Sequence, residues 1–359
     1  MGRKALILAN NSDGLFRFRH ELLQELKNKY DIIASTPFDN FIPELETICE
    51  AVIQTEFDRR SVNPAKDFRL LKSYAQIIDK VKPDLVITYT IKPNIYGGLV
   101  SRFKKVPYAV NITGLGTAFE NDGIIQKIVV MLYKIAMKKA KIIFFENSGD
   151  RIIFVNKTKI PIDKTHVLYG AGVNTQIYAY QPYPSNDKVR FLFIGRVMKE
   201  KGIEELIEAS KRLIHEGFQC HIDIVGPCEE DYKAQLEECE KAGWLKYHGF
   251  QSDVKPFIRE CDCFVLPSYH EGMANTNLEC ASSGRPIITS NIPGCREAIV
   301  EGSGLLCEPK NNESLYEAMK AMIEKTREER EQMGQVGRKH MQDVFDKNKV
   351  VSDTIKYLF

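Results

Sequence analysis

Short runs of consecutive apolar residues recur along the whole chain and constrain its fold more than any other feature. Residues 5–9, 85–90 and 142–145 are apolar at most successive positions rather than at alternate ones. Strands of this kind are buried on both faces, as in a parallel sheet that helices cover on both sides. The stretches between the runs are amphipathic and about 10–15 residues long, the length of the crossover helix in a βαβ unit. The pattern predicts an α/β fold.

The predicted strands fall into two series. The first comprises residues 5–9, 31–35, 85–90, 108–111, 142–145 and 167–169; the second comprises 190–195, 221–225, 245–248, 263–267, 286–289 and 304–306. Between the series, residues 178–188 contain two prolines and no periodicity, which is typical of a linker. A chain of 359 residues has room for two domains. We therefore predict two doubly wound domains, residues 1–178 and 179–342. Residues 343–359 carry an apolar face that packs either in the second domain or on the first.

Charge and cysteine content exclude several classes of protein. The 50 basic and 48 acidic side chains give a formal net charge of +2, so we expect no nucleic-acid partner. Nine cysteines without a C-x-x-C pair indicate reduced thiols and a cytoplasmic location. No apolar run approaches the roughly 20 residues of a spanning helix. The run at residues 4–10 is too short for a secretory signal and is predicted to be a strand.

Two basic residues lie in the loop that follows strand 190–195. Arg196 and Lys201 come between a buried strand and the start of a predicted helix. The N-terminus of a helix presents free N–H groups and a partial positive charge. Together with an Arg and a Lys, such a terminus suits a multiply charged anion such as a diphosphate. The alternative is that both are ordinary solvated loop residues.

The loop after strand 263–267 carries carboxylates. Glu271 lies in the loop, and Glu279 lies about one turn into the next helix. Carboxylates accept hydrogen bonds from sugar hydroxyls. Gly272 allows a close approach of the backbone, and the N–H groups of residues 273–275 can cap an anion. The alternatives are a solvated loop charge for Glu271 and a helix-surface residue for Glu279.

The motif G-R-x-x-x-x-K-G at residues 195–202, followed by E-x7-E at residues 271–279, resembles that of retaining glycosyltransferases of the GT-B fold, family four. The resemblance implies two Rossmann-like domains facing a cleft, with a C-terminal helix that crosses back to the first domain. It also implies a nucleotide-sugar donor bound by the C-terminal domain, an acceptor bound by the N-terminal domain, and no metal or other cofactor. Arg196 and Lys201 would hold the donor diphosphate, Glu271 the donor sugar and Glu279 the ribose.

The N-terminal half is similar to a bacterial subgroup of this family. The similarity lies in residues 16–19 (FRFR), 60–64 (RSVNP) and 112–116 (ITGLG). Members extend lipid-diphosphate-linked saccharides for capsule, O-antigen or protein glycans. The subgroup implies a UDP-sugar donor, carrying a hexose or N-acetylhexosamine, and a polyprenyl-diphosphate-linked saccharide acceptor. The chain departs from the pattern at Thr113, where an acidic residue is expected, and at Met273-Ala274, where Phe-Pro is commoner.

The resemblance also suggests how the reaction proceeds. The acceptor hydroxyl would attack on the face from which the diphosphate leaves, so no protein nucleophile is expected. The predicted catalytic residues are Arg196, Lys201 and Glu271. The predicted donor-binding residues are Gly14, Arg196, Lys201, Asp253, Glu271, Gly272, Met273, Ala274, Asn275 and Glu279. The predicted acceptor-binding residues are Arg19, Lys92, Asn94, Asn111, Thr113 and Gly114.

Several of these predictions rest on position after a strand. Gly14 lies in the loop after the first strand and would approach the diphosphate, unless it is an ordinary turn glycine. Lys92 and Asn94 follow strand 85–90 and would meet the acceptor diphosphate, unless they are solvated. Asp253 would lie near the base, with a helix N-cap as the alternative of equal weight.

Residues 124–141 read as a basic amphipathic helix with five lysines. Such a helix can lie on an anionic membrane surface, here the inner face of the plasma membrane. The alternative is a crossover helix packed on the sheet with a solvated lysine end.

Three other functions compete with transfer of a sugar. A nicotinamide-dependent dehydrogenase requires G-x-G-x-x-G, and residues 114–119 supply only the first two glycines. A sugar-nucleotide epimerase of the same fold would act without an acceptor. A non-catalytic sugar-nucleotide or lipid-binding subunit would show damage to the basic pair or the glutamates, and all four residues are intact.

Overall fold

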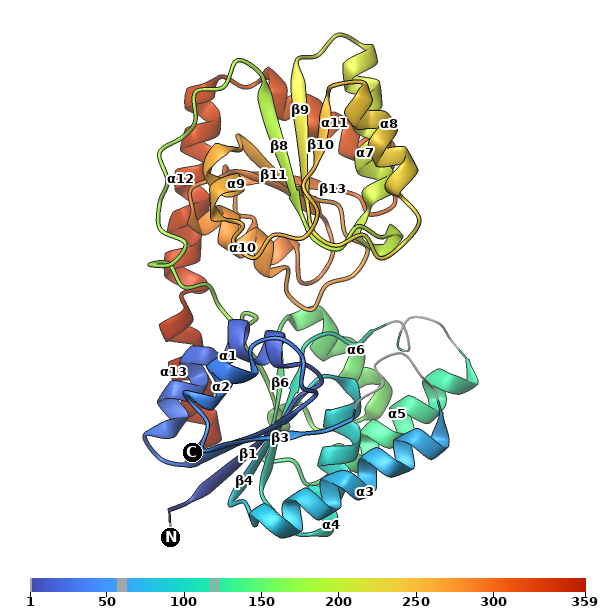
Figure 1. Cartoon of the computed structure of the whole chain (residues 1–359), viewed down its shortest axis with the longest axis vertical. Helices are drawn as coiled ribbons and strands as arrows, with labels where there is room; N and C mark the ends of the chain where they lie inside the picture. Colours follow the sequence, from blue (N-terminus) through green and yellow to red (C-terminus); the bar gives the residue numbers. More distant parts are fainter. Residues whose placement is uncertain (1, 57–62, 117–118, 120–122) are drawn as a thin grey trace. The chain divides into compact units, whose positions relative to one another are not determined.

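The computed structural model describes residues 2–56, 63–116, 119 and 123–359, and it divides the chain into two compact units (Figure 1). Unit 1 runs to Ala171 and includes Asn348–Phe359, and unit 2 comprises Gly172–Lys347.

Unit 1 is built on a parallel sheet of seven strands in the order β3-β2-β1-β4-β5-β6-β7. The strands are β1 (Lys4–Leu8), β2 (Asp31–Thr36), β3 (Ala51–Gln54), β4 (Leu85–Tyr89), β5 (Tyr108–Ile112), β6 (Ile142–Phe145) and β7 (Thr165–Val167). The helices are α1 (Ser12–Lys27), α2 (Ile42–Glu46), α3 (Pro64–Val81), α4 (Gly98–Phe103), α5 (Ile124–Met137), α6 (Ser148–Thr158) and α13 (Lys347–Leu358), with the π-helical turn η1 (Pro93–Gly97) and the 3-10 turn η3 (Ile162–Lys164).

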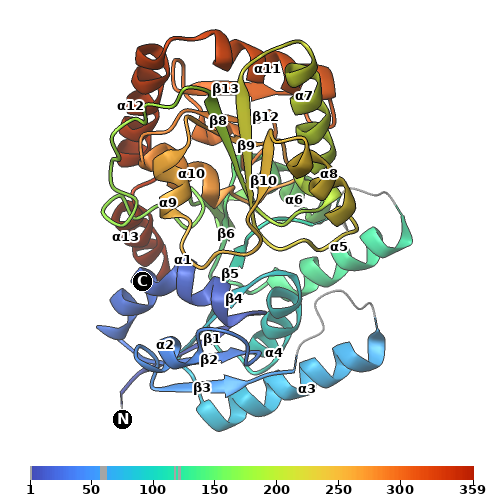
Figure 2. The ribbon, with the colours of Figure 1, turned by 45° about the horizontal axis from the view of Figure 1, so that its top comes forward.

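Alternate residues of the same strand enter two different cores. In β1, Leu6 and Leu8 pack with α3, α5 and α6, whereas Ala5 and Ile7 pack with α1, α2 and α13. The two sets of helices accordingly cover opposite faces of the sheet (Figures 1 and 2). This two-sided burial is the reason that apolar residues follow one another along the strands.

Unit 2 is built on a parallel sheet of six strands in the order β10-β9-β8-β11-β12-β13. The strands are β8 (Val189–Ile194), β9 (Cys220–Val225), β10 (Leu245–Tyr247), β11 (Cys263–Leu266), β12 (Ile287–Ser290) and β13 (Gly304–Cys307). The helices are α7 (Ile203–His215), α8 (Lys233–Lys241), α9 (Lys255–Glu260), α10 (Asn275–Ser282), α11 (Asn312–Glu324) and α12 (Arg327–Val344), with the 3-10 turns η4 (Lys199–Lys201) and η5 (Arg296–Ala298).

The two parallel sheets confirm the predicted α/β fold class. One strand, β3, was absent from the prediction. It has four residues at the edge of its sheet, and none of them is buried, although Ala51, Val52 and Ile53 form a short apolar run. The last strand of unit 1 lies at Thr165–Val167, two residues before the predicted 167–169.

The units divide at Ala171/Gly172 and Lys347/Asn348, whereas the sequence suggested breaks after residues 178 and 342. Residues around 173 and 346 explain the difference. The N–H of Val173 donates to the Phe345 carbonyl at 2.8 Å, and the N–H of Lys347 donates to the Val173 carbonyl at 3.0 Å. The chain therefore leaves and re-enters unit 1 along two segments that lie side by side.

Helix α13 is held on unit 1 by apolar and polar contacts. Val350 and Leu358 are buried in the core beside α1. Nε2 of His166 lies 2.6 Å from Oδ2 of Asp353, and its ring stacks on Tyr357 with 3.8 Å between centroids. These contacts confirm the predicted return of the last helix to the first domain.

Buried polar groups tie the linker to unit 2. Arg285 is fully buried, and its guanidinium donates to the carbonyls of Gln181, Pro182, Ile258 and Arg259. Residues 181–182 are thus fixed by a side chain that precedes β12, and the prolines that suggest a flexible linker lie in an ordered segment.

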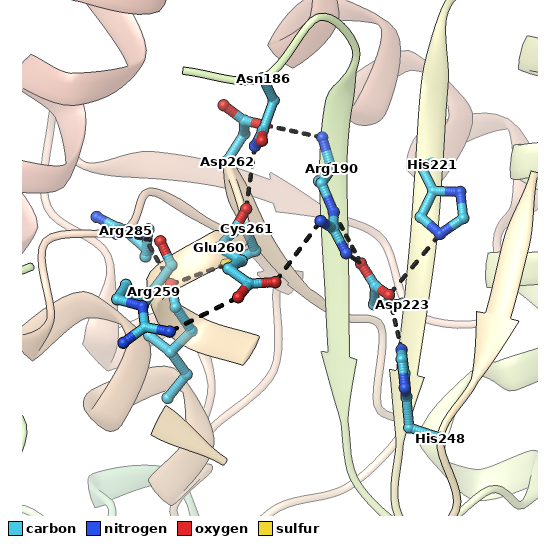
Figure 3. Close-up of polar contacts among 11 residues, drawn as sticks. Asn186, Arg190, His221, Asp223, His248, Arg259, Glu260, Cys261, Asp262 and Arg285 are labelled. Carbon is cyan, nitrogen blue, oxygen red and sulfur yellow. Dashed lines mark hydrogen bonds and ion pairs between the residues drawn. The ribbon is translucent and has the colours of Figure 1, made fainter. Parts of the chain in front are cut away.

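A second set of polar contacts crosses the face of the same sheet (Figure 3). Asp223 in β9 is 3% exposed, and its carboxylate accepts from Nη2 of Arg190 at 2.8 Å. Its other oxygen lies 2.8 Å from Nε2 of His248. Burial lowers the pKa of the neighbouring His221, although the Asp223 carboxylate opposes this shift. The carboxylate is therefore the common partner of a β8 arginine and a histidine that follows β10.

Replacing Asp223 by Ala is expected to lower the free energy of unfolding of unit 2 by about 3 kcal/mol, because Arg190 loses its close, buried partner and keeps only Glu260, 3.7 Å away. The fluorescence of Trp244, the one tryptophan of the chain, reports this transition from the core of unit 2 during urea unfolding. Asp343, which is exposed and pairs with Lys339 one helical turn away, gives the matched control. Asp343→Ala should change the free energy by less than about 0.5 kcal/mol. If both substitutions lowered the free energy of unfolding equally, the contacts of Asp223 would not be a special source of stability in unit 2.

Candidate functional site

The loop after β8 has the strand–turn–helix form that the sequence predicts. Strand β8 ends at Ile194, the turn η4 covers Lys199–Lys201, and α7 begins at Ile203. Gly202 joins the turn to the helix with a φ of 73°, and a Cβ there would lie 2.2 Å from the Pro267 carbonyl oxygen. Only glycine permits this approach, which brings the loops after β8 and β11 together at the carboxyl edge of the sheet.

Lys201 and Glu271 form an ion pair across these two loops. Oγ of Ser268 donates to the same carboxylate oxygen of Glu271 at 2.8 Å, and both charged side chains are mostly buried. The loop after β12 packs against the backbone of Glu271. Gly294 packs so closely that a Cβ would lie 2.4 Å from the Glu271 carbonyl oxygen. Three loops thus fix one cation and one carboxylate at the start of α7.

Arg196 lies in the same loop, before the turn η4, and its side chain pairs with a different carboxylate. Its Nη1 lies 3.0 Å from Oε2 of Glu229, which belongs to the loop after β9, and the arginine side chain is about half exposed. The structure therefore places both predicted diphosphate-binding cations at the carboxyl edge of unit 2, where open α/β sheets bind their ligands.

Sequence reasoning missed a buried pair that supports this loop. The Tyr269 hydroxyl donates to Oε1 of Glu205 in α7 at 2.6 Å, and the Tyr269 N–H donates to the Glu200 carbonyl at 2.9 Å. Burial, together with the Glu205 carboxylate, raises the pKa of the Tyr269 hydroxyl. The signal was a glutamate at an inward-facing position of an amphipathic helix, between Ile203 and Leu206.

The loop and first turn before Glu279 contain several of the predicted donor-binding residues. Asn275 and Glu279 lie four residues apart on the half-exposed face of α10, whereas Met273 and Ala274 bury their side chains in the core. The N–H of Ala274 donates to the Gly294 carbonyl at 2.8 Å. The close packing of the β12 loop thus uses this N–H, and the capping of an anion by residues 273–275 stays a prediction. Gly272 is half-buried next to Glu271.

Asp253 lies one residue before Val254, the N-cap residue of α9. Its Oδ1 accepts from the Lys255 N–H at 3.1 Å at the start of α9, and its side chain is exposed. Contact with a nucleotide base remains a prediction for this residue.

Gly14 belongs to the first turn of α1 in unit 1, and its N–H donates to Oδ1 of Asn11, the N-cap residue, at 2.7 Å. A Cβ at Gly14 would lie 2.5 Å from that oxygen. The glycine therefore suits this helix cap, and its approach to a diphosphate stays a prediction.

Arg19 is nearly buried and paired. Its Nη2 lies 2.6 Å from Oε1 of Glu146, and its guanidinium lies over the Tyr89 ring, 4.9 Å from the centroid. Glu146 directly follows β6 and was not a candidate in the sequence, because a single carboxylate after a strand carries no motif. The arginine and this carboxylate lie together near the carboxyl edge of the unit 1 sheet.

Asn94 and Asn111 are both buried, and the amide of Asn94 donates to the Asn111 carbonyl at 2.8 Å and accepts from the Thr88 hydroxyl. These bonds hold the π-helical turn η1 against β4 and β5. Contact of either residue with the acceptor stays a prediction. Lys92, by contrast, is partly exposed and pairs with Asp67 at 2.9 Å.

Thr113 and Gly114 follow β5 and are half-exposed, so their predicted roles stay open. Of the RSVNP segment, Arg60, Ser61 and Val62 lie outside the described residues, as do Thr117 and Ala118 of the rejected glycine motif. Across the described parts of the chain, no helix is both long and apolar enough to cross a membrane.

Comparison with known families divides the chain as the sheets do. Residues 5–147 match the family model described as "Glycosyl transferase 4-like", and residues 180–340 match "Glycosyl transferases group 1". Together the two matches cover most of the chain.

The names of two relatives state the substrates on which those proteins act. The N,N'-diacetylbacillosaminyl-diphospho-undecaprenol alpha-1,3-N-acetylgalactosaminyltransferase of Campylobacter jejuni is 27% identical over 339 residues, 88% of this chain and 88% of the relative. The UDP-Gal:alpha-D-GlcNAc-diphosphoundecaprenol alpha-1,3-galactosyltransferase of Escherichia coli is 28% identical over 280 residues, 72% and 71% of the two chains.

Solved structures share the whole fold. A glycosyltransferase of Rickettsia africae superposes with a TM-score of 0.79 at 20% identity, covering 99% of this chain and 98% of its own. HepE of Anabaena, in complex with UDP, superposes with a TM-score of 0.78 at 17% identity and covers 99% of both chains.

Gly202→Ala is expected to lower the free energy of unfolding of unit 2 by about 3 kcal/mol or more. The new Cβ would clash with the Pro267 carbonyl oxygen, and alanine would also be strained at the positive φ of this residue. Gly217 provides the control, since its φ is 88° but no atom lies within 4 Å of its Cβ position. Gly217→Ala should cost only about 1 kcal/mol. Urea unfolding followed by Trp244 fluorescence compares the two variants, and similar losses would show that the loop contact is not tight.

Proposed function

The chain is a glycosyltransferase, with a 4-like N-terminal domain and a group 1 C-terminal domain, and we propose that it moves a hexose or N-acetylhexosamine from a UDP-sugar to a lipid-diphosphate-linked saccharide with retention of configuration. Two relatives act, by name, on diphosphoundecaprenol-linked sugars, and one of them names UDP-Gal. The bound UDP of the Anabaena neighbour also supports a uridine nucleotide. The product would serve bacterial surface polysaccharide or glycan synthesis.

The observation that carries the proposal is the convergence of Lys201, Arg196 and Glu271 at the start of α7. Two cations beside a helix N-terminus favour an anion with several negative oxygens. The adjacent carboxylate accepts hydrogen bonds from hydroxyls. A diphosphate bonded to a sugar has both features, with the charge and the hydroxyls only a few bonds apart.

The reaction proceeds by exchange at the anomeric carbon. The bond from this carbon to the diphosphate oxygen breaks as the acceptor oxygen bonds to the same face, and the acceptor proton passes to the leaving oxygen. Arg196 and Lys201 stabilise the negative charge that develops on the diphosphate. Glu271, oriented by Ser268 and Lys201, holds the donor sugar. Glu279 and Asn275 present the half-exposed face of α10 to the ribose.

In unit 1, the candidates for the acceptor remain Arg19, Lys92, Asn94, Asn111, Thr113 and Gly114. The pair of Arg19 with Glu146 adds a carboxylate that the sequence did not suggest. The proposal also includes a cytoplasmic location, with peripheral contact at the membrane that carries the acceptor, and a reaction that needs no metal ion.

Arg196→Ala and Lys201→Ala are each expected to lower kcat by about 10²-fold, because each removes a charge that stabilises the leaving diphosphate. Lys199→Ala is the matched control, since Lys199 lies in the same turn but its Nζ pairs with Glu204, 3.3 Å away. Its rate should change by less than about threefold. The assay follows sugar transfer from UDP-GalNAc, UDP-GlcNAc, UDP-galactose and UDP-glucose to lipid-linked acceptors, with and without EDTA.

The outcomes separate the competing functions. Transfer that survives EDTA and depends on both cations supports the proposal. Turnover of the UDP-sugar without any acceptor would instead indicate an epimerase. A thermal shift with UDP but no turnover of any kind would indicate a binding subunit. Activity with GDP-sugars alone would exclude the uridine donor.

Tyr269→Phe is expected to reduce kcat/KM for the UDP-sugar about tenfold, because Glu271 loses the Glu205 anchor of its loop. The Kd of UDP itself should change less than twofold, since Arg196 and Lys201 are unaltered. Tyr232→Phe is the control, as its hydroxyl donates to the neighbouring Glu204 at 3.0 Å. An equal loss of UDP affinity in Tyr269→Phe would show that the tyrosine supports the whole site instead of the sugar side.

A further inference from the structure

Helix α5 is apolar on two opposite sides. Its inner side packs in the core of unit 1 through Tyr133, Ala136 and Met137, all of which are fully buried. Its outer side carries a second apolar row with no place in that core. The row consists of Ile124, Ile128, Met131 and Ile135, whose exposed fractions are 78%, 48%, 53% and 39%. Helices that are apolar all round are normally buried on every side.

The outer row forms one continuous stripe. Its members are spaced by four, three and four residues, which is the repeat of a single helical face. Ile125, 58% exposed, widens the stripe at its N-terminal end. The helix lies on the outside of unit 1, beside α4 (Figures 1 and 2).

Positive charge lines the stripe without any negative charge. Lys127, Lys134 and Lys138 follow the same repeat, so they form a row along its edge. Lys139 continues the positive charge beyond the helix, and residues 124–141 contain no aspartate or glutamate. Nζ of Lys141 instead donates to the Leu358 carbonyl of α13 at 2.6 Å. All five lysines are exposed.

The end of α4 extends this surface. Nη1 of Arg102 donates to the Ile135 carbonyl, which places the turn at residues 102–105 beside the last part of the stripe. The turn reads Arg-Phe-Lys-Lys, and Phe103 is 77% exposed. Within it, Lys104 pairs with Asp79 of α3 at 2.5 Å, so its charge is already balanced. An exposed aromatic ring between basic residues repeats the pattern of α5.

We propose that α5 and residues 102–105 form a surface that docks on an anionic lipid bilayer. A row of large apolar side chains beside charges of one sign matches an interface whose outer layer is negative and whose interior is apolar. The same surface is a poor fit to a second copy of this chain, because its lysines would face one another. The proposed function supplies only the reason for this docking, since a lipid-linked acceptor lies in such a bilayer. The surface itself is inferred from the side chains of α5 and residues 102–105.

Lipid vesicles test the surface directly with the full chain. Co-sedimentation is measured with phosphatidylglycerol-containing vesicles and with neutral phosphatidylcholine vesicles, at 50 and 500 mM salt. We expect binding to the anionic vesicles that weakens with salt, because the lysine contribution is screened. Replacing Lys127, Lys134 and Lys138 by Gln should weaken this binding about 100-fold, at about fivefold per lysine. Replacing Ile128, Met131 and Ile135 by Gln should weaken binding at least about tenfold at both salt concentrations.

Matched variants in unit 2 provide the controls. Lys233, Lys241 and Lys246 are exposed lysines outside the surface, and Ile177 is an isoleucine that is 55% exposed. Their Gln variants should bind vesicles as the unaltered chain does. Wild-type chain that stays in solution with anionic vesicles at 50 mM salt would overturn the proposal without any variant. Equal loss in the control variants would overturn it too, and a concentration-dependent dimer that the Ile128 variant abolishes would assign the stripe to a second copy.

Transfer assays distinguish this proposal from the proposed function. If both hold, the α5 variants lose activity on vesicle-bound acceptor but keep it on a short-chain, water-soluble acceptor. If the chain binds vesicles and transfers no sugar, the surface stands and the proposed function fails. If it transfers sugar to vesicle-bound acceptor with the α5 variants unimpaired, the function stands and the surface is wrong.

Discussion

The structure depends on one constraint, which is that a parallel sheet cannot present a bare face to water. Both sheets consist of parallel strands, so each face needs its own layer of helices. In unit 1 this constraint divides alternate residues of β1 between two cores. It also sends every loop that leaves a strand's carboxyl end to one edge of its sheet. The polar residues of the candidate site meet at such an edge because the topology leaves them no other place.

At that edge, close packing of the backbone determines which side chains can meet. Gly202 and Gly294 allow three loops to approach within van der Waals distance, and Lys201 and Glu271 meet because of it. The charges in this part of unit 2 are paired, Lys201 with Glu271 and Arg196 with Glu229. When a donor diphosphate binds, Lys201 and Arg196 would exchange these carboxylates for phosphate oxygens. Because both cations already have a partner of opposite charge, neither has to be buried unpaired before the donor arrives.

The sequence predicts the fold well because burial on both faces leaves an apolar run in nearly every strand. It fails at β3, which is an edge strand without buried residues. Among site residues, spacing places Arg196, Lys201 and Glu271 on adjoining loops, since a motif records where backbone turns. It cannot tell whether a polar group is already satisfied. The Gly14 N–H serves the N-cap Asn11, only three residues away. Asn94 bonds to residues of two neighbouring strands, and the Ala274 N–H bonds to the Gly294 carbonyl of another loop. Tyr269 and Glu205 escaped notice for the same reason, because their pairing spans 64 residues.

The return of α13 to unit 1 has a consequence for how the polypeptide is made. One core of unit 1 contains Val350 and Leu358, which are synthesised after the whole of unit 2. On the ribosome, the first 171 residues emerge with one face of their sheet incompletely covered, and they stay so while some 176 further residues are added. Unit 2 is continuous and can finish folding first. The nascent N-terminal half is therefore the part of this chain that most needs protection from aggregation before release.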